Sequence, residues 1–239
     1  MAARAALITG GSSGIGLAVA RALGEDGHAL TVSARRPDKL EEAAEGLRAA
    51  GIDVSCVQAN MSKEEDIQAL AEAHRERYGR LDVLMNNAGV GIGGAIEQAE
   101  TKKLDMQLDV NLRAVYLMSR ETIPMLKQAG KEHGKALVVN TASIAGKYGQ
   151  GWLAAYSATK FGVVGLSQAM HRELSGEGVQ VTALCPGFVD TAMTDWVEDV
   201  ESHEMIQPSD IAEAVRYLLR TSPACIVPEI QFIRPSDPM

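Results

Sequence analysis

Tyr156 and Lys160 stand four residues apart in a predicted helix, so their side chains share one helix face and can meet. An ammonium near a phenol lowers the pKa of the phenol from its ordinary ~10, because the positive charge favours the phenolate. The phenol can then donate or accept a proton at working pH. Ser143 lies thirteen residues upstream, just after a predicted strand, where its hydroxyl can hydrogen-bond a reacting oxygen. Together the three residues indicate acid–base chemistry at a substrate oxygen.

A glycine-rich turn follows the first predicted strand and begins the first predicted helix. Its sequence is Thr9-Gly10-Gly11-Ser12-Ser13-Gly14-Ile15-Gly16. Glycine allows the positive φ of a tight turn and lets the backbone approach a pyrophosphate closely. The free N–H groups of a helix N-terminus then bind the anion. A structural turn without a ligand is the alternative, but a position after strand one of a βαβ series favours dinucleotide binding.

Short apolar runs alternate with amphipathic stretches along the whole chain. The predicted strands are residues 5–9, 29–34, 53–58, 83–86, 136–140, 180–184 and 229–233. Several of these runs are continuously apolar, which is typical of parallel strands buried on both faces. Apolar residues recur at helical spacing in residues 15–23, 67–78, 163–174 and 211–219.

This alternation predicts an α/β fold, a doubly wound parallel sheet with helices on both faces. Neither a linker-like segment nor an internal repeat divides the sequence, so residues 1–239 are predicted to form a single domain. The one long irregular stretch covers residues 186–207. A loop of that length within a compact domain is usually functional or mobile.

Composition narrows the classes of partner. The chain has 239 residues and a formal net charge of −8, which argues against nucleic acid or an anionic membrane as the main partner. Its three scattered cysteines indicate free thiols in a reducing compartment, and its five histidines lack metal-ligand spacing, so no metal is predicted. Glycines interrupt the uncharged stretch at residues 5–20, and no membrane span is predicted, so a cytoplasmic location is expected.

Four further motifs extend the pattern of the glycine turn. They are Tyr156-Ser157-Ala158-Thr159-Lys160, Asn86-Asn87-Ala88-Gly89, Asp109-Val110-Asn111-Leu112 and Pro186-Gly187-Phe188-Val189-Asp190-Thr191. With the turn they resemble the YxxxK, NNAG, catalytic-asparagine, PGxxxT and TGxxxGxG motifs of the short-chain dehydrogenase/reductase family. The motifs occur in family order across residues 5–191, and the chain length fits. The resemblance implies a Rossmann-type sheet of about seven strands in the order 3-2-1-4-5-6-7.

The resemblance also implies a catalytic set of Asn111, Ser143, Tyr156 and Lys160. In this set Tyr156 is the general acid in reduction and the general base in oxidation. Lys160 lowers the pKa of the tyrosine and binds the nicotinamide ribose. Ser143 orients and polarises the carbonyl, and Asn111 holds a water that relays protons to Lys160. The hydride chemistry belongs to the cofactor, and the protein supplies position and electrostatics.

A nicotinamide dinucleotide is the cofactor that the resemblance implies. Asn87 is expected to support the central strand and contact the cofactor, and Val189 and Thr191 to hold the nicotinamide carboxamide. The full expected cofactor-binding set is Gly10, Ser12, Ser13, Gly14, Ile15, Gly16, Arg35, Arg36, Asn60, Met61, Asn87, Ala88, Gly89, Tyr156, Lys160, Pro186, Gly187, Val189 and Thr191.

The residues after the second predicted strand bear on the choice between NADP(H) and NAD(H). NAD-binding folds place an acid there for the ribose 2′-hydroxyl, whereas an arginine accommodates a 2′-phosphate. This chain has Ala34, Arg35 and Arg36, and a guanidinium fork suits a phosphate. NADP(H) is therefore favoured over NAD(H), the alternative being that both arginines are solvated charges. Asn60 departs from the family aspartate that bonds the adenine amino group, although an amide oxygen can accept the same bond without charge.

Substrate recognition is expected mainly from residues 187–207, which the resemblance makes a substrate-binding loop. Apolar side chains in this loop indicate an apolar pocket, unless they pack on the domain instead. Its acidic residues count against a bulky anionic substrate. The expected substrate residues are Ser143, Tyr156, Phe188 and Trp196. Tyr148 and Trp152 flank the catalytic tyrosine and can line the opposite wall.

Three interpretations of function stay open. The leading one is an NADP(H)-dependent carbonyl reductase or alcohol dehydrogenase that acts on a small ketone, diketone or cyclic carbonyl. A 3-oxoacyl carrier-protein or thioester reductase needs a basic docking patch, which Arg113, Lys127, Lys131 and Arg172 can supply, although the net charge gives no support. A non-catalytic NADP-binding sensor is disfavoured, because the catalytic set is complete. By family analogy the chain is expected to form a homo-oligomer, a dimer or a homotetramer.

Overall fold

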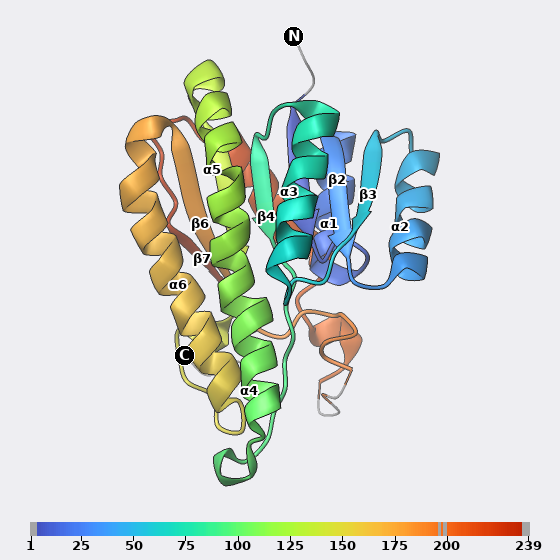
Figure 1. Cartoon of the computed structure of the whole chain (residues 1–239). Helices are drawn as coiled ribbons and strands as arrows, with labels where there is room; N and C mark the ends of the chain where they lie inside the picture. Colours follow the sequence, from blue (N-terminus) through green and yellow to red (C-terminus); the bar gives the residue numbers. More distant parts are fainter. Residues whose placement is uncertain (1–3, 196, 198–199, 236–239) are drawn as a thin grey trace.

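The computed structural model describes residues 4–195, 197 and 200–235 and arranges them around one parallel β-sheet (Figure 1). Its strands are β1 (Ala5–Thr9), β2 (Ala29–Ala34), β3 (Val54–Gln58), β4 (Val83–Asn86), β5 (Ala136–Thr141), β6 (Val179–Pro186) and β7 (Glu229–Phe232). Their order across the sheet is β3-β2-β1-β4-β5-β6-β7, and every neighbouring pair is parallel. The predicted fold class and strand order are confirmed.

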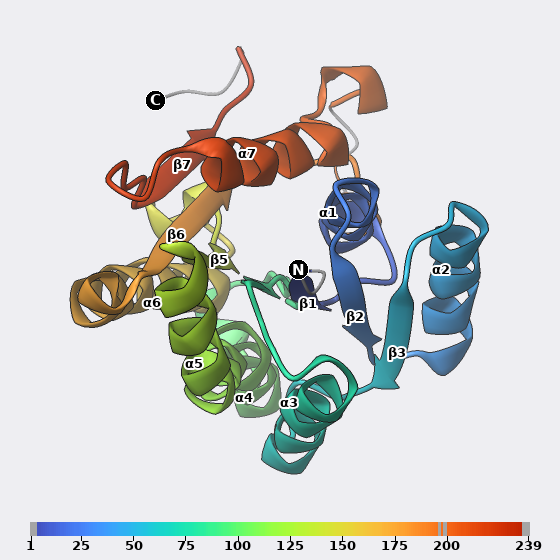
Figure 2. The ribbon, with the colours of Figure 1, turned by 90° about the horizontal axis from the view of Figure 1, so that it is seen from above.

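Helices cover both faces of the sheet (Figure 2). One face carries α1 (Gly14–Glu25), α2 (Pro37–Ala49) and α7 (Pro208–Arg220), and the other carries α3 (Glu64–Tyr78), α5 (Ala114–His133) and α6 (Ala154–Leu174). The short α4 (Thr101–Leu108) lies beyond the carboxyl ends of the strands, and a π-helical turn (Asp109–Arg113) joins it to α5. Single 3-10 turns occur at Ile96–Gln98, Ile144–Gly146, Ser175–Glu177 and Ser202–Glu204. None of the helices in the described residues is both long and apolar enough to cross a membrane.

Each face of the sheet has its own apolar core. In β1 the alternate residues Ala6 and Ile8 pack among α1, α2 and α7, whereas Leu7 packs on the side of α3 and α5. All five residues of β1 are buried. A strand with helices on both sides has no solvent-facing row, which explains why the sequence of this strand is continuously apolar.

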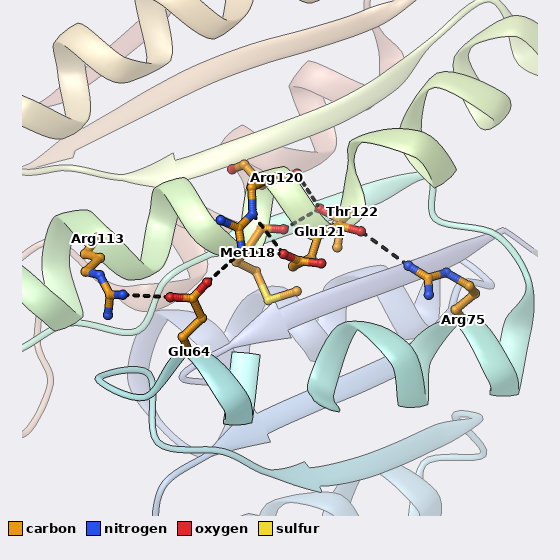
Figure 3. Close-up of polar contacts among 8 residues, drawn as sticks. Glu64, Arg75, Arg113, Met118, Arg120, Glu121 and Thr122 are labelled. Atoms are coloured by element: carbon orange, nitrogen blue, oxygen red, sulfur yellow. Dashed lines mark hydrogen bonds and ion pairs between the residues drawn. The ribbon is translucent and has the colours of Figure 1, made fainter. Parts of the chain in front are cut away.

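A polar network joins the start of α3 to α5 on the outer surface (Figure 3). The Glu64 carboxylate accepts hydrogen bonds from Arg113 at 2.7 Å and from Arg120 at 2.8 Å. Arg120 also pairs with Glu121, whose backbone oxygen accepts a bond from Arg75. These groups are largely exposed, so each pair contributes little to stability, but together they neutralise the basic residues along this side of α5.

The amino edge of the sheet, opposite the carboxyl ends of the strands, holds a buried polar cluster. Asp82 accepts a hydrogen bond from the backbone N–H of Ala5 at 2.8 Å and two from the Arg80 guanidinium at 2.8 and 2.7 Å. Nearby, both ring nitrogens of the fully buried His74 are partnered, Nδ1 by the hydroxyl of Thr31 and Nε2 by the carbonyl oxygen of Arg80. Burial lowers the pKa of His74 to about 4, against the opposing influence of Arg80 and Asp82.

We expect the protein to lose stability as the pH falls from 6.5 toward 4. The unfolded chain protonates His74 in that range and the folded chain does not, so the contribution of this residue is complete above pH 6.5 and is lost below it. The loss from His74 alone is about 2 kcal/mol between pH 7.5 and pH 5. Urea unfolding at both pH values would measure it in the parent and in His74→Gln.

The glutamine variant should show a smaller drop between the two pH values, whatever its stability at pH 7.5. His203→Gln, which changes an exposed histidine, is the matched control and should keep the parent's drop. An equal drop in all three proteins would show that His74 does not determine this pH dependence.

Candidate active site

The carboxyl ends of the strands meet at one edge of the sheet, the lower edge in Figure 1. The glycine turn follows β1, Asn87 follows β4 and Ser143 comes two residues after β5. Pro186 ends β6, and α6 begins beside them with Tyr156 near its start. An open parallel sheet binds its ligands at this edge, so the topology alone brings together motifs that lie far apart in the sequence.

The glycine turn forms a close-packed cradle. Gly10 and Gly14 have φ of +65° and +51°, in the left-handed region that glycine enters without strain. A Cβ on Gly16 would overlap the carbonyl oxygen of Gly10, and one on Gly14 would lie 2.8 Å from the Thr191 methyl. Ser13 is the N-cap residue of α1, but its side chain makes no hydrogen bond to the first turn of the helix. The first-turn N–H groups are thus presented at the turn, which fits a pyrophosphate.

Thr9 fixes the position of the loop that follows β4. Its hydroxyl oxygen accepts the backbone N–H groups of Asn87 at 3.0 Å and Ala88 at 3.1 Å. The Asn87 side chain donates to the carbonyl oxygen of Gly10 and accepts a bond from the hydroxyl of Thr141. Asn87 therefore links the ends of β1, β4 and β5, so the glycine turn cannot shift independently of the other two strands.

Ser143, Tyr156 and Lys160 lie together at the end of β5. The Ser143 hydroxyl lies close enough to the Tyr156 phenol to lower its pKa, and it donates a 3.3 Å hydrogen bond to the carbonyl oxygen of Pro186. The Lys160 ammonium lies 5.5 Å from the centroid of the tyrosine ring and donates a 2.7 Å hydrogen bond to the carbonyl oxygen of Thr141. Lys160 is only 4% exposed, so its charge depends on such partners.

Asn111 lies in the π-helical turn before α5 and faces the same site. Its side-chain oxygen accepts the N–H of Val90 at 2.8 Å, and its amide donates to the carbonyl oxygen of Val90 at 2.9 Å and to the hydroxyl of Thr159. A Cβ on Gly89 would lie 3.4 Å from the Asn111 oxygen and 3.7 Å from the Lys160 nitrogen. The structure thus brings Asn111 and Gly89 next to the lysine.

The pKa of Tyr156 differs in direction from the sequence-based expectation. Burial raises it above the ordinary value, and the hydrogen bond from Ser143 offsets only part of the rise. Burial also lowers the pKa of Lys160 to about 8. The expected lowering of the tyrosine pKa is wrong, because desolvation outweighs an ammonium 5.5 Å away from the ring. The phenol therefore carries its proton at neutral pH.

Arg35 and Arg36 follow β2 at the same edge and are exposed. Neither guanidinium pairs with a carboxylate among the residues that the structure describes. Many other arginines of this chain form such pairs, as Arg48 does with Glu41. An arginine pair without carboxylate partners at the end of β2 is available for an external anion.

Asn60 and Met61 are less accessible to a cofactor through their side chains. The side-chain oxygen of Asn60 accepts two bonds from Ser62, one from its N–H at 3.2 Å and one from its hydroxyl at 3.0 Å. Met61 is buried in the core under α3 and α5. A contact from Met61 would therefore use its backbone, and Asn60 would have to share an oxygen already used in a local turn.

The segment after β6 folds back on itself. Val189 is buried and forms an isolated parallel bridge with Ile206, so the two ends of the segment are held together. The N–H of Gly187 donates to the carbonyl oxygen of Phe232, and the guanidinium of Arg234 lies 5.3 Å from the centroid of the Phe188 ring. Trp196, the other substrate residue predicted here, lies outside the described residues.

Three threonines hold the catalytic and cofactor residues in position, although the sequence did not single them out. They are Thr9, Thr141 and Thr159, whose hydroxyls or carbonyls contact Asn87, Lys160 and Asn111. Ser143 and Tyr156 stood out by their spacing to a lysine, but a threonine at a strand end or in a helix has no comparable signal.

Comparison with known proteins agrees with this geometry. The family model described as short chain dehydrogenase matches residues 4–201. A protein of Streptomyces coelicolor, provisionally named a ketoacyl reductase, is 38% identical over 92% of each chain. A variant of actinorhodin polyketide ketoreductase, solved with NADPH, is 35% identical, covers 97% of each chain and has a TM-score of 0.85. The 3-ketoacyl-(acyl-carrier-protein) reductase of Brucella melitensis, solved with NADH, is 30% identical over 96% of each chain, with a TM-score of 0.87.

These matches extend over nearly the whole chain and include the sheet, the glycine turn and the segment that carries the tyrosine and lysine. The family model ends at residue 201, and the Streptomyces coelicolor relative covers 92% of this chain. The chain belongs to the short-chain dehydrogenase family.

Proposed function

We propose that this protein is an NADPH-dependent carbonyl reductase in which Tyr156 is the proton donor. The observation that carries the proposal is the grouping of Ser143, Tyr156 and Lys160 beside an uncapped helix N-terminus and its glycine cradle. This arrangement places acid–base groups next to a site that fits a dinucleotide. NADPH would supply the hydride, and the chain's own residues handle the oxygen atom of the substrate.

The protonation states favour the reductive direction. The raised pKa of Tyr156 keeps its phenol protonated at neutral pH, so the phenol can donate a proton to a carbonyl oxygen. Ser143 lies beside the phenol, where its hydroxyl can bond the same oxygen. The Lys160 ammonium, near the ring, stabilises the phenolate that remains after transfer. Asn111 is held by its two hydrogen bonds to Val90 and lies on the side of the site next to Lys160. We assign this side as the route by which a new proton reaches Tyr156 after each transfer.

We assign NADP(H) rather than NAD(H) on the arginine pair after β2. Arg35 and Arg36 have no carboxylate partner in the described part of the chain. The 2′-phosphate of NADP(H) would be an anionic partner for both guanidinium groups. NADPH in the actinorhodin relative supports this assignment, whereas the Brucella relative was solved with NADH. Because the relatives differ in their bound cofactor, the preference of this chain for NADP(H) has to be tested by changing Arg35 or Arg36.

A free carbonyl compound fits the surface better than a substrate attached to a carrier protein. Of the four basic residues considered for carrier docking, Arg113 pairs with Glu64, and both Lys127 and Lys131 pair with Glu177. Paired cations attract an acidic partner less than unpaired ones. A 3-oxoacyl substrate stays the second proposal, because the relatives include ketoacyl reductases.

The proposal also covers the organisation of the chain. Residues 1–239 are assigned to one oxidoreductase domain, because a single sheet contains all seven strands from β1 to β7. Residues 187–207 are assigned as its substrate loop, since the bridge between Val189 and Ile206 closes the base of that segment beside the site. Its three cysteines are all free thiols, which supports a reducing compartment such as the cytoplasm.

A homo-oligomer is proposed from an exposed apolar face. Leu104 and Leu108 of α4, Tyr116 of α5 and Phe161 of α6 are all more than a third exposed. Single exposed apolar side chains are ordinary, but several on neighbouring helices mark an interaction surface. Packing this face against a second copy would bury it, and a further pairing of dimers would give the homotetramer expected by family analogy.

Replacing the proposed proton donor should stop turnover without releasing the cofactor. In Tyr156→Phe the ring is kept and the proton is removed, so NADPH oxidation with a panel of ketones, diketones and 3-oxoacyl thioesters should fall about 10²- to 10⁴-fold. NADPH binding, followed by its fluorescence, should change little. Parent-level turnover in the variant would rule out Tyr156 as the acid. NADPH binding by the parent without turnover on any substrate would favour the sensor interpretation.

Reversing one charge after β2 should weaken the binding of NADPH but not that of NADH. In Arg35→Asp the dissociation constant for NADPH should rise about 10- to 100-fold, because a charged hydrogen bond is lost and a repulsion added, while NADH binding should change little. Arg21→Asp, which makes the same charge change on the exposed side of α1, is the control and should affect neither. Equal losses for NADPH and NADH would refute the 2′-phosphate role.

The apolar face should be buried in solution. We expect light scattering to give a mass of two or four chains for the parent and a smaller mass for Tyr116→Glu, because a carboxylate cannot be buried unpaired in an apolar interface. Tyr217→Glu places the same change on α7, on the other face of the sheet, and should retain at least a dimer. A parent mass near 25 kDa would refute the oligomer.

A further inference from the structure

Trp152 has an unusual backbone conformation next to the start of α6. Its φ is +67°, and it is the one residue other than glycine with positive φ in the described part of the chain. A bulky residue reaches this region only at a cost in free energy, so surrounding contacts must hold it there. Such strain is concentrated at active sites, ligand clamps and switch regions.

Two contacts with the segment after β4 hold Trp152 in place. The N–H of Gly94 donates a 2.8 Å hydrogen bond to the carbonyl oxygen of Trp152. The indole lies directly on Gly93, so that a Cβ on this glycine would overlap the indole carbons Cζ3 and Cε3. Only glycine leaves room for the ring. Residues 93–94 and Trp152 thus interlock, each fixing the position of the other.

The segment held in this way passes the proposed proton donor. A Cβ on Gly91 would lie 3.9 Å from the Tyr156 ring and 4.0 Å from the Cγ of Met193. On its other side the segment is fixed by Asn111, which bonds Val90 in both directions. Residues 90–94 are therefore anchored at the catalytic asparagine and at Trp152, and the tyrosine ring lies between the two anchors.

Much of the indole stays accessible after this packing. Trp152 is 59% exposed, and the large apolar side chains Tyr148, Ile96 and Met193, from the segments that follow β5, β4 and β6, are more than 40% exposed. Met193 lies beside Gly91, and all these segments follow the carboxyl ends of strands. Exposed apolar side chains at the strand ends that carry a polar reaction site are suited to bind the apolar part of a substrate.

We propose that Trp152, locked on Gly93, is a specificity-determining residue that binds the flat apolar body of the substrate while Tyr156 acts on its carbonyl oxygen. The substrate class is then a ketone attached to an aromatic or polycyclic ring system. This inference rests on the carbonyl reductase function proposed above. It does not require the indole to touch the reacting atoms, and its effect falls on binding rather than on proton transfer.

The test compares two ketones in the presence of NADPH. In Trp152→Gly the indole is removed and the new residue accepts φ of +67° without strain, so the backbone is preserved. For 2-acetylnaphthalene kcat/KM should fall by about tenfold or more, mainly through KM, because an apolar contact area is lost. For butane-2,3-dione kcat/KM should change less than about threefold, because this short substrate does not reach the indole.

Three further variants make the test specific. Trp152→Phe keeps a ring and should retain most of the activity on 2-acetylnaphthalene. Gly93→Ala leaves Trp152 in the sequence but displaces its ring, and should reproduce the selective loss. Tyr217→Ala, an exposed aromatic change on α7, should affect neither ketone. Equal effects on both ketones, or no effect in Trp152→Gly, would overturn the proposal.

A binding measurement separates this inference from the proposed function. Calorimetry with 2-acetylnaphthalene and the NADP⁺-loaded protein reports ring binding without any turnover, because the oxidised cofactor has no hydride to transfer to the ketone. Weaker binding in Trp152→Gly than in the parent supports the indole contact even if neither ketone is reduced, in which case only the reductase function fails. Binding of equal strength in both proteins, or none in the parent, would reject the role of Trp152 whether or not turnover occurs.

Discussion

A buried ammonium constrains the whole reaction site. Lys160 is removed from water, and its charge is stabilised by the carbonyl oxygen of Thr141 at the end of β5. That bond requires α6 to run very close to the turn after β5, where a Cβ on Gly146 would lie 2.6 Å from the carbonyl oxygen of Lys160. The close approach places Ser143 within hydrogen-bonding reach of Tyr156. Because an unpartnered buried charge is costly, the lysine, the strand end and the serine turn have to be positioned together.

The same edge is linked to the cofactor side through hydroxyl and amide groups. Thr9 holds the loop after β4, and Asn87 bonds both the glycine turn and Thr141. Thr191 packs against Gly14, so the segment after β6 touches the turn directly. Three strand ends, the phosphate cradle and the substrate segment thus form one connected set of short contacts, with little freedom to adjust separately. Preorganisation of this kind is what proton and hydride transfer need.

The sequence predicts the sheet well because burial on both faces leaves a clear record in continuous apolar strands. The apolar spacing does not reveal α2, whose buried positions are two leucines and two alanines among charged residues, or α5, which has Pro124 within it. Spacing brings Ser143, Tyr156 and Lys160 together correctly. The direction of the tyrosine pKa is missed, because desolvation depends on how the surrounding elements pack, and residue spacing carries no measure of that. The contact of Trp152 with Gly93 is likewise invisible, since it joins segments some sixty residues apart only in the folded chain.

The two ends of the sheet have different roles, one in stability and the other in binding and catalysis. The buried Arg80 and Asp82 pair, with His74 beside it, lies at the amino edge, whereas every segment proposed to touch substrate or cofactor lies at the carboxyl edge. Loops at the carboxyl edge can therefore be exchanged with little effect on the anchoring cluster. For protein engineering this separation makes the chain a modular scaffold: exposed positions such as Ile96, Tyr148 and Met193 can be diversified as a library while the opposite end preserves the fold.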